Sequence, residues 1–78
     1  MTLEILTPEK SLYHGESSSV TLPGVDGSFQ LLNRHAPLIS ALAKGVVKYK
    51  VGSETRTLTI GGGFVECLKN NVIVLVEG

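Results

Sequence analysis

VVKYKVGSETRTLTI, residues 46–60, is the stretch that decides the fold. Val47, Tyr49 and Val51 alternate with two lysines. A period of two is typical of a β-strand that buries one face and exposes the other, because successive side chains of a strand point to opposite sides. The first half of this stretch therefore predicts a half-buried strand.

The second half of the stretch predicts a partner for that strand. Gly52–Glu54 contains residues that favour a turn, and Leu58 and Ile60 then alternate with threonines. We predict a β-hairpin in which Leu58 and Ile60 face the core.

The same alternation occurs on both sides of this hairpin. Further strands are expected around Leu3 and Ile5, in hairpins on either side of the Pro23–Gly27 loop, and on either side of the Asn70-Asn71 turn. The paired segments are Ser19–Leu22 with Phe29–Leu31, and Phe64–Leu68 with Val72–Val76. Only Pro37–Lys44, which ends at Gly45, predicts a short helix.

Many short strands separated by Gly, Pro and Asn indicate an all-β sandwich or barrel. The 78 residues suit a single domain, residues 1–78, without repeats or linkers. Val72–Val76 is apolar at every position, which predicts that something covers both faces of this strand.

Composition excludes several classes of protein. Hydrophobic residues make up 42% and charged residues 18% of the chain, so a disordered tail is excluded. Seven basic side chains balance seven acidic ones, so there is no cationic excess for neutralising phosphates. We therefore expect no nucleic-acid partner.

The single cysteine, Cys67, cannot form an internal disulfide and is predicted to be a buried apolar residue in a reducing compartment. The N-terminal residues lack the pattern of a secretory signal, and no apolar run approaches the roughly 20 residues needed to span a bilayer.

Gly61–Gly63 could be read as a phosphate-binding loop. However, no Gly-Lys-Ser/Thr follows, and the triplet leads into a predicted strand rather than a helix. A bulge or sharp bend between strands is the preferred interpretation, because glycine permits positive φ and close approach of the backbone.

Two sets of reactive side chains raise the question of catalysis or metal binding. Asp26, Ser28 and His35 supply the residue types of a hydrolase, but no nucleophile elbow presents the serine. His14 and His35 lack metal-ligand spacing. We therefore expect no catalytic residues, metal or cofactor in this chain.

The loop around His35 has two readings that composition leaves open. It is either a structural turn in which His35 bonds nearby backbone, or a stiff docking loop that presents Phe29, His35, Pro37 and Leu38 to another protein. A free-standing β module that binds a peptide or ligand along an edge strand is the alternative function.

Five motifs, in order, closely resemble the epsilon subunit of F-type ATP synthases, over essentially the whole chain. They are Leu-x-Ile-x-Thr-Pro-Glu at 3–9, Val-x-Leu-Pro-Gly-x-Asp-Gly-x-Phe at 20–29, Leu-x-x-His-Ala-Pro-Leu at 32–38, Gly-Gly-Phe-Val-Glu at 62–66 and Asn-x-Val at 70–72.

The resemblance implies a flattened antiparallel β-sandwich of about ten short strands. It also implies a non-catalytic rotor subunit in the central stalk, which docks on the gamma subunit and the c-subunit ring and helps couple ion-driven rotation to ATP synthesis. Such a subunit lies at the cytoplasmic face of the bacterial inner membrane, attached only through the complex.

The matching motifs imply that the rotor interface consists of Gly27, Ser28, Phe29, His35, Ala36, Pro37 and Leu38. Some relatives have an acidic residue at the position of Ser28. Because serine carries no charge, the case for a charge-based contact with the ring is weaker at this position. Family members commonly continue into an inhibitory helical hairpin, whereas this sequence stops at Gly78. Whether the subunit is naturally short or truncated, we expect inhibition by a hairpin to be absent.

Overall fold

A computed structural model describes residues 1–77, and these residues form nine strands and no helix. The strands are β1 (Thr2–Leu6), β2 (Ser11–Glu16), β3 (Ser19–Gly24), β4 (Gly27–Leu32), β5 (Leu38–Leu42), β6 (Gly45–Val51), β7 (Glu54–Ile60), β8 (Gly62–Leu68) and β9 (Asn71–Glu77). Gly78, the last residue of the predicted domain, lies outside the described residues. Within the described part, no helix is long and apolar enough to cross a membrane.

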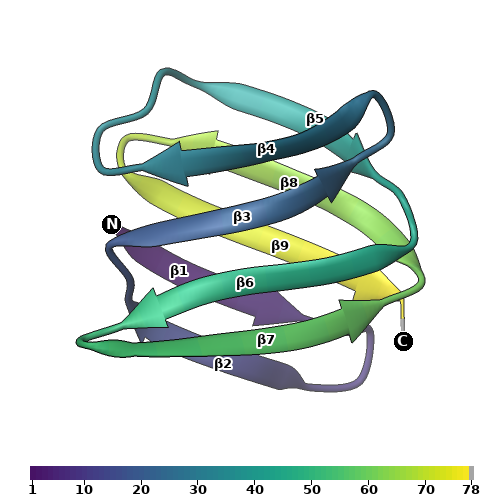
Figure 1. Ribbon diagram of the computed structural model, residues 1–78, viewed down its shortest axis with the longest axis horizontal. Coiled ribbons are helices and arrows are strands. Elements are labelled where there is room, and N and C mark those ends of the chain that lie inside the picture. Colours follow the sequence, from purple (N-terminus) through teal and green to yellow (C-terminus); the bar gives the residue numbers. More distant parts are fainter. Residues whose placement is uncertain (78) are drawn as a thin grey trace.

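The strands lie in two layers that face each other (Figure 1). One layer has the order β4-β3-β6-β7 and the other β5-β8-β9-β1-β2. A single pair, Gly24 of β3 with Leu42 of β5, joins them into one curled sheet. The predicted all-β sandwich is confirmed, with nine strands rather than about ten. Most neighbours are antiparallel, although β1 and β9 are parallel.

Apolar and polar side chains alternate along the strands, so the apolar side chains form a core between the two layers. The side chains that are fully buried come from strands of both layers: Leu3, Ile5, Val20, Leu22, Leu31, Val47, Ile60, Val65, Val72 and Val74. The hairpin of β6 and β7 is confirmed, with Val47 opposite Leu58. Burial of each such side chain contributes roughly 1.5–3 kcal/mol to folding, so this shared interior holds the layers together.

The predicted helix over Pro37–Lys44 is wrong, because this segment contains β5. Leu38 and Leu42 face inward, whereas Ile39 faces outward, so the segment has the period of a strand. The antiparallel partner β8 runs along the whole of β5. Backbone pairing with β8 thus overrides the weak helical preference of a short segment.

Strand β2 was not predicted from the sequence. Its side chains are mostly exposed, and only Tyr13 and Gly15 are half-buried. It pairs with β1 at the edge of the five-stranded layer, so it contributes little apolar surface to the core. The hydrophobic alternation that reveals the other strands is therefore nearly absent.

The bend predicted at Gly61–Gly63 is confirmed. Gly62 and Gly63 have φ of 142° and 150°, values that residues with a side chain rarely adopt. A Cβ on Gly63 would lie 2.0 Å from the carbonyl oxygen of Leu75, so only glycine allows β8 and β9 to approach here.

Candidate functional site

The structure separates the predicted site residues into two groups at opposite ends of β4. One group begins β4 and the other follows its end: Gly27, Ser28 and Phe29 in the first, His35, Ala36, Pro37 and Leu38 in the second. A six-residue strand is about 17 Å long, at roughly 3.3 Å per residue. Figure 1 shows the turn before β4 at the right and the connection from β4 to β5 at the left. The docking-loop reading placed Phe29 on one stiff loop with His35, Pro37 and Leu38, and this part of the reading is wrong because Phe29 lies at the other end of β4.

The Gly27 group lies at a tight hairpin turn. Gly27 has φ of 126° and pairs with Gly24, so the turn itself is shorter than the predicted Pro23–Gly27 loop. Ser28 is exposed, whereas Phe29 is half-buried and packs against the core. Phe29 thus helps to fix this end of the strand, whereas the side chain of Ser28 lies in solvent.

The His35 group lies on a loop that is fastened to the turn between β8 and β9. Arg34 has a left-handed backbone with φ of 63°, and its N–H donates a 2.8 Å hydrogen bond to Oδ1 of Asn70. The N–H of His35 donates to the carbonyl of Leu32 at 3.2 Å, and its Nδ1 lies 2.7 Å from the carbonyl oxygen of Ala36. The bond to nearby backbone that the structural-turn reading expects of His35 is thus present.

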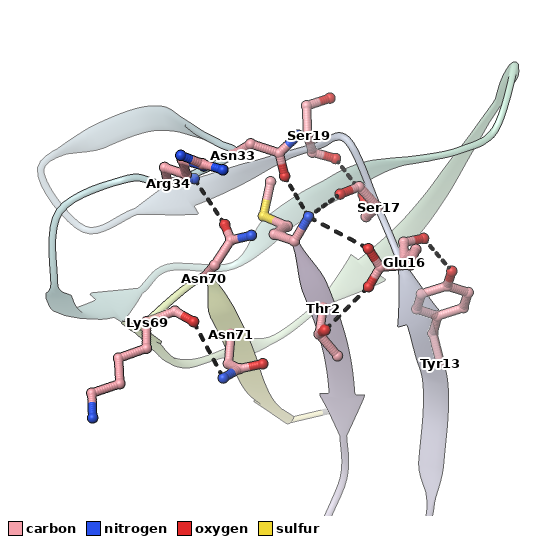
Figure 2. Close-up of polar contacts among 11 residues, drawn as sticks. Thr2, Tyr13, Glu16, Ser17, Ser19, Asn33, Arg34, Lys69, Asn70 and Asn71 are labelled. Carbon is pink, nitrogen blue, oxygen red and sulfur yellow. Dashed lines mark hydrogen bonds and ion pairs between the residues drawn. The ribbon is translucent and has the colours of Figure 1, made fainter.

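A second set of contacts holds the start of the same loop. Oδ1 of Asn33 accepts a hydrogen bond from the nitrogen of Met1, which also donates to the carbonyl of Ser17 at 3.1 Å. Figure 2 shows these contacts beside those of Glu16, where Thr2 donates to the carboxylate. The β4–β5 loop is thus tied to the start of β1 and to the connection between β2 and β3.

The fastened loop borders a surface hollow lined by apolar and cationic side chains. Ala36, Pro37 and Leu68 supply apolar surface, and Arg34 and Lys69 carry the positive charges. Lys69 and Asn70 share the left-handed backbone of Arg34, so the non-glycine residues with positive φ among residues 1–77 all gather here. Such strain persists only where the surroundings hold it, and it clusters at functional sites.

The residues of the hydrolase alternative lie apart. Asp26 and Ser28 flank the start of β4, and His35 follows its end, about 17 Å or more away at the rise of a strand. The three side chains therefore do not form a triad.

The two histidines are also separated. His14 projects from β2 at one edge of the five-stranded layer, and His35 precedes β5 at the other. Across residues 1–77 no group of three or more His, Cys, Asp and Glu side chains has the geometry to hold a metal ion.

Cys67 is buried and free, as predicted. Desolvation raises the pKa of its thiol above the ordinary value. Its Sγ lies 3.9 Å from the carbonyl oxygen of His35, so it forms part of the support beneath the loop. A protonated, buried thiol is a poor nucleophile.

The aromatic side chains do not line one groove. Tyr13 and Tyr49 pack with ring centroids 5.0 Å apart, and the Arg56 guanidinium lies 5.7 Å from the Tyr13 ring. Phe29 packs on the core, whereas Phe64 is exposed. The alternative of a peptide-binding β module would be distinguished by a groove lined with aromatic side chains, and the aromatic residues among residues 1–77 do not form one.

Sequence reasoning missed Asn33 and Asn70, the two side chains that fasten the loop. Their bonds join residues 32 and 36 positions apart, so local pattern could not predict them. Only Asn70 gave a signal, because an Asn-Asn turn favours positive φ.

The sequence matches a family model described as ATP synthase, Delta/Epsilon chain, beta-sandwich domain, over residues 1–78. The chain belongs to this family. The resemblance drawn from the five motifs is thereby confirmed.

Relatives of this family member carry the name ATP synthase epsilon chain. The one from Chlorobaculum tepidum is 44% identical over 77 residues, which cover 97% of this chain and 88% of the relative. The one from Leptospira interrogans is 36% identical over 77 residues, which cover 99% of this chain. This chain spans only 61% of the Leptospira protein.

Two solved structures share the fold. A chain of the Tetrahymena thermophila mitochondrial ATP synthase central stalk/c-ring structure matches with a TM-score of 0.83 and 20% identity, over 99% of this chain and 63% of that one. A chain of the Euglena gracilis mitochondrial ATP synthase structure, OSCP/F1/c-ring, matches with a TM-score of 0.91 and 19% identity, over 97% of this chain and 49% of that one.

Proposed function

We propose that this chain is the epsilon-type β-sandwich domain of an F-type ATP synthase and works as a non-catalytic part of the rotor. The observation that carries the proposal is the family match over residues 1–78, with epsilon chains among the relatives. In this proposal residues 1–78 are one domain at the cytoplasmic face of a bacterial inner membrane. It is held there by the gamma subunit and the c-subunit ring.

The physical requirement for such a role is stiffness. A part of the rotor that twists easily stores rotation as elastic strain, whereas a stiff part passes rotation to its partners with little lag. A close-packed protein interior has low compressibility and transmits strain. In this chain the interior is filled from both layers, and the β4–β5 loop is fastened by Asn33 and Asn70 rather than left free.

Docking is proposed through both groups of site residues. Ser28 presents a hydroxyl at the turn end of β4, and the His35 loop presents the hollow lined in part by Arg34 and Lys69. Because these ends lie about 17 Å apart, we propose that the docked partner surface, formed by gamma and the ring together, reaches both.

Binding to purified gamma subunit from the same organism tests the proposal. We expect the folded chain and gamma to co-elute in size-exclusion chromatography at micromolar concentration. Separate elution, with circular dichroism showing that the chain remains a β-protein, would contradict it. In a complex with the ring, His35→Ala should weaken association while the melting temperature is unchanged; a matched loss of both would assign His35 a structural role only.

A further inference from the structure

The outer face of the four-stranded layer carries a row of polar side chains that crosses all four strands. This layer is the nearer one in Figure 1. Register places Gln30 of β4 opposite Thr21 of β3. Thr21 also lies opposite Lys48 of β6, and Lys48 lies opposite Thr57 of β7. Because directly opposite residues of a sheet have Cβ atoms about 5 Å apart, these side chains can reach one another's ligands.

A second lysine lies on the same face, in the next row. Lys50 follows Lys48 by two residues on β6 and lies opposite Thr55 of β7. Alternate residues of a strand point to the same side, at a rise of about 3.3 Å per residue. The two lysines therefore leave the sheet about 7 Å apart, which is close enough for both ammonium groups to contact one small ligand.

A small hollow opens on this face. Its volume is about 170 Å³, and outward side chains of all four strands line it: Ser19, Thr21, Gln30, Lys48, Lys50 and Thr55. We call it the polar hollow. Clefts that hold drug-sized ligands measure roughly 300–1,000 Å³, so the polar hollow suits a smaller ligand that is bound by polar groups.

The two positive charges of the polar hollow are not balanced within the described chain. The ion pairs among residues 1–77 join Met1 with Glu16 and Arg56 with Glu54, so neither Lys48 nor Lys50 takes part in one. The outward positions of the four described strands hold no Asp or Glu. Since the whole chain has seven basic and seven acidic side chains, this excess comes from how the charges are distributed.

The outer face of the five-stranded layer has the opposite character. Ile39 is 73% exposed and Phe64 59%, and the carboxylates of Glu4 and Glu66 occupy outward positions there. The prediction that both faces of Val72–Val76 are covered holds, within residues 1–77, only for the face toward the core. The sandwich thus offers two unlike surfaces, and an anion is attracted to the one with the polar hollow.

A small anion fits the polar hollow better than a macromolecule does. Protein interfaces are usually centred on a buried aromatic or aliphatic anchor. The exposed apolar side chains on this face, Leu32 and Val46, do not line the hollow. A nucleic acid is bound by many phosphate contacts, and two lysines supply too few.

The number of charges selects the kind of anion. A phosphate monoester carries nearly two negative charges at neutral pH and has three strong acceptor oxygens. Lys48 and Lys50 match this charge, whereas a carboxylate or a phosphodiester carries one charge and leaves a lysine unmatched. The hydroxyl of Thr21 and the amide of Gln30 can donate to the remaining oxygens.

We propose that the polar hollow binds a phosphoryl group with two negative charges, either free phosphate or the end of a phosphorylated molecule. Lys48 and Lys50 supply the charge, and the neighbouring hydroxyl and amide groups orient the oxygens. This site needs neither the gamma subunit nor the c-subunit ring, so it does not rest on the proposed function.

The test is an NMR titration of the full chain, in which backbone amide shifts are followed as inorganic phosphate is added at constant ionic strength. Lys48→Gln, Lys50→Gln and the double variant remove the charges. Lys10→Gln removes one positive charge from the exposed turn between β1 and β2 and is the matched control. Thr21→Val removes a hydroxyl but keeps a residue that favours strands. A dispersed amide spectrum establishes that each variant is folded.

We expect the amides of Thr21, Lys48 and Thr57 to shift together and to saturate with one dissociation constant in the millimolar range. Lys48→Gln or Lys50→Gln should weaken binding roughly threefold to tenfold, as for loss of one charged hydrogen bond. The double variant should show no saturation, whereas Lys10→Gln should bind as the wild-type chain does. Thr21→Val should weaken binding by a smaller factor than either lysine variant.

Vesicles distinguish the two sources of such a group. Co-sedimentation with phosphatidylcholine vesicles that contain phosphatidic acid, lost in the double variant, would identify a lipid headgroup as the ligand. Saturable phosphate binding without co-sedimentation would identify a soluble phosphorylated molecule. If the chain responds to neither, the inference is wrong.

Three further results would overturn the inference. Shifts of similar size near every lysine, which grow without saturation, would mean that phosphate acts only as a bulk anion. Saturation confined to amides near Arg34 and Lys69 would place the anion at the other hollow. If the double variant loses binding to purified gamma and the wild-type chain ignores phosphate, the face docks an acidic protein. By contrast, a chain that binds phosphate but not gamma contradicts the proposed function and supports this site.

Discussion

Oδ1 of Asn70 accepts a hydrogen bond of 2.8 Å from the backbone N–H of Arg34, and both residues have φ of 63°. One side chain thus joins the turn between β8 and β9 to the loop that carries His35. Because the backbone carbonyl of Asn70 also accepts from the N–H of Thr2 at 3.0 Å, the same residue holds the start of β1.

Asn70→Ala should lower the free energy of unfolding by about 2 kcal/mol, because it removes the acceptor for Arg34 and places at positive φ a residue that tolerates this backbone less well than Asn. Asn70→Gly should cost about half as much, since glycine accepts the backbone angle and only the bond is lost. Urea denaturation measures both. Asn71→Ala, at the exposed neighbour, is the control and should change stability by less than about 0.5 kcal/mol; equal costs at the two positions would contradict the assigned role.

Gly63→Ala should destabilise the chain by more than about 3 kcal/mol or prevent folding, because the added Cβ has no room beside the Leu75 carbonyl. Gly52→Ala provides the comparison. Gly52 also has positive φ, but apart from its two chain neighbours no described residue has an atom within 4 Å of the place a Cβ would take, so only backbone strain of about 1–2 kcal/mol is expected. Thermal melts that rank Gly52→Ala as the more harmful change would show that the close approach of β8 and β9 is misplaced.

Ile60→Ala should cost roughly 2–5 kcal/mol, as expected for a fully buried aliphatic side chain. Leu58 is half-buried against the core, so Leu58→Ala should cost less than Ile60→Ala. Chemical denaturation measures both values, with the exposed Val46→Ala as control. A loss below about 0.5 kcal/mol for Ile60→Ala would mean that β7 is in the wrong register.

The Cys67 thiol predicts how stability changes at alkaline pH. Burial raises its pKa in the folded chain above the ordinary value of 9.0, so the folded state keeps the proton that the unfolded state loses. The contribution of Cys67 to stability is therefore complete below pH 9.0 and declines as the pH rises toward the folded pKa. Urea midpoints at pH 7 and pH 10, for wild type and Cys67→Ala, check this: the wild-type chain should lose more between the two. An equal loss would show that the thiol is solvated.

How far the fold could be predicted depends on how much of each strand faces the core. The hairpin of β6 and β7 was predicted because Val47, Tyr49 and Ile60 supply alternate buried positions. Strand β2 gave no such signal, since its exposed edge position leaves only Tyr13 with a partly buried side chain of any size. The prediction for β5 was wrong because its pairing with β8, and not its own sequence, makes it a strand.

The sequence predicted which residues belong to the candidate site, but it did not predict how they are arranged in space. Ser28 and His35 are close in the sequence, yet a strand between them places them at opposite ends of β4. The bonds of Asn33 and Asn70 depend on segments far away in the chain, and only the fold brings these together. The pairing of Phe64 with Leu75 likewise depends on the register of β8 and β9, which local sequence does not fix.

The most direct test of the central claim is cysteine cross-linking in a complex of the chain with gamma and the c-subunit ring. Ser28→Cys and Ala36→Cys, each in a Cys67→Ala background, place a single thiol at one end of β4. The account predicts that each forms a cross-link to gamma or to a c subunit, whereas Thr55→Cys, near the start of β7 at the opposite edge of the layer that contains β4, does not. A fully assembled complex in which neither Ser28→Cys nor Ala36→Cys cross-links would contradict it.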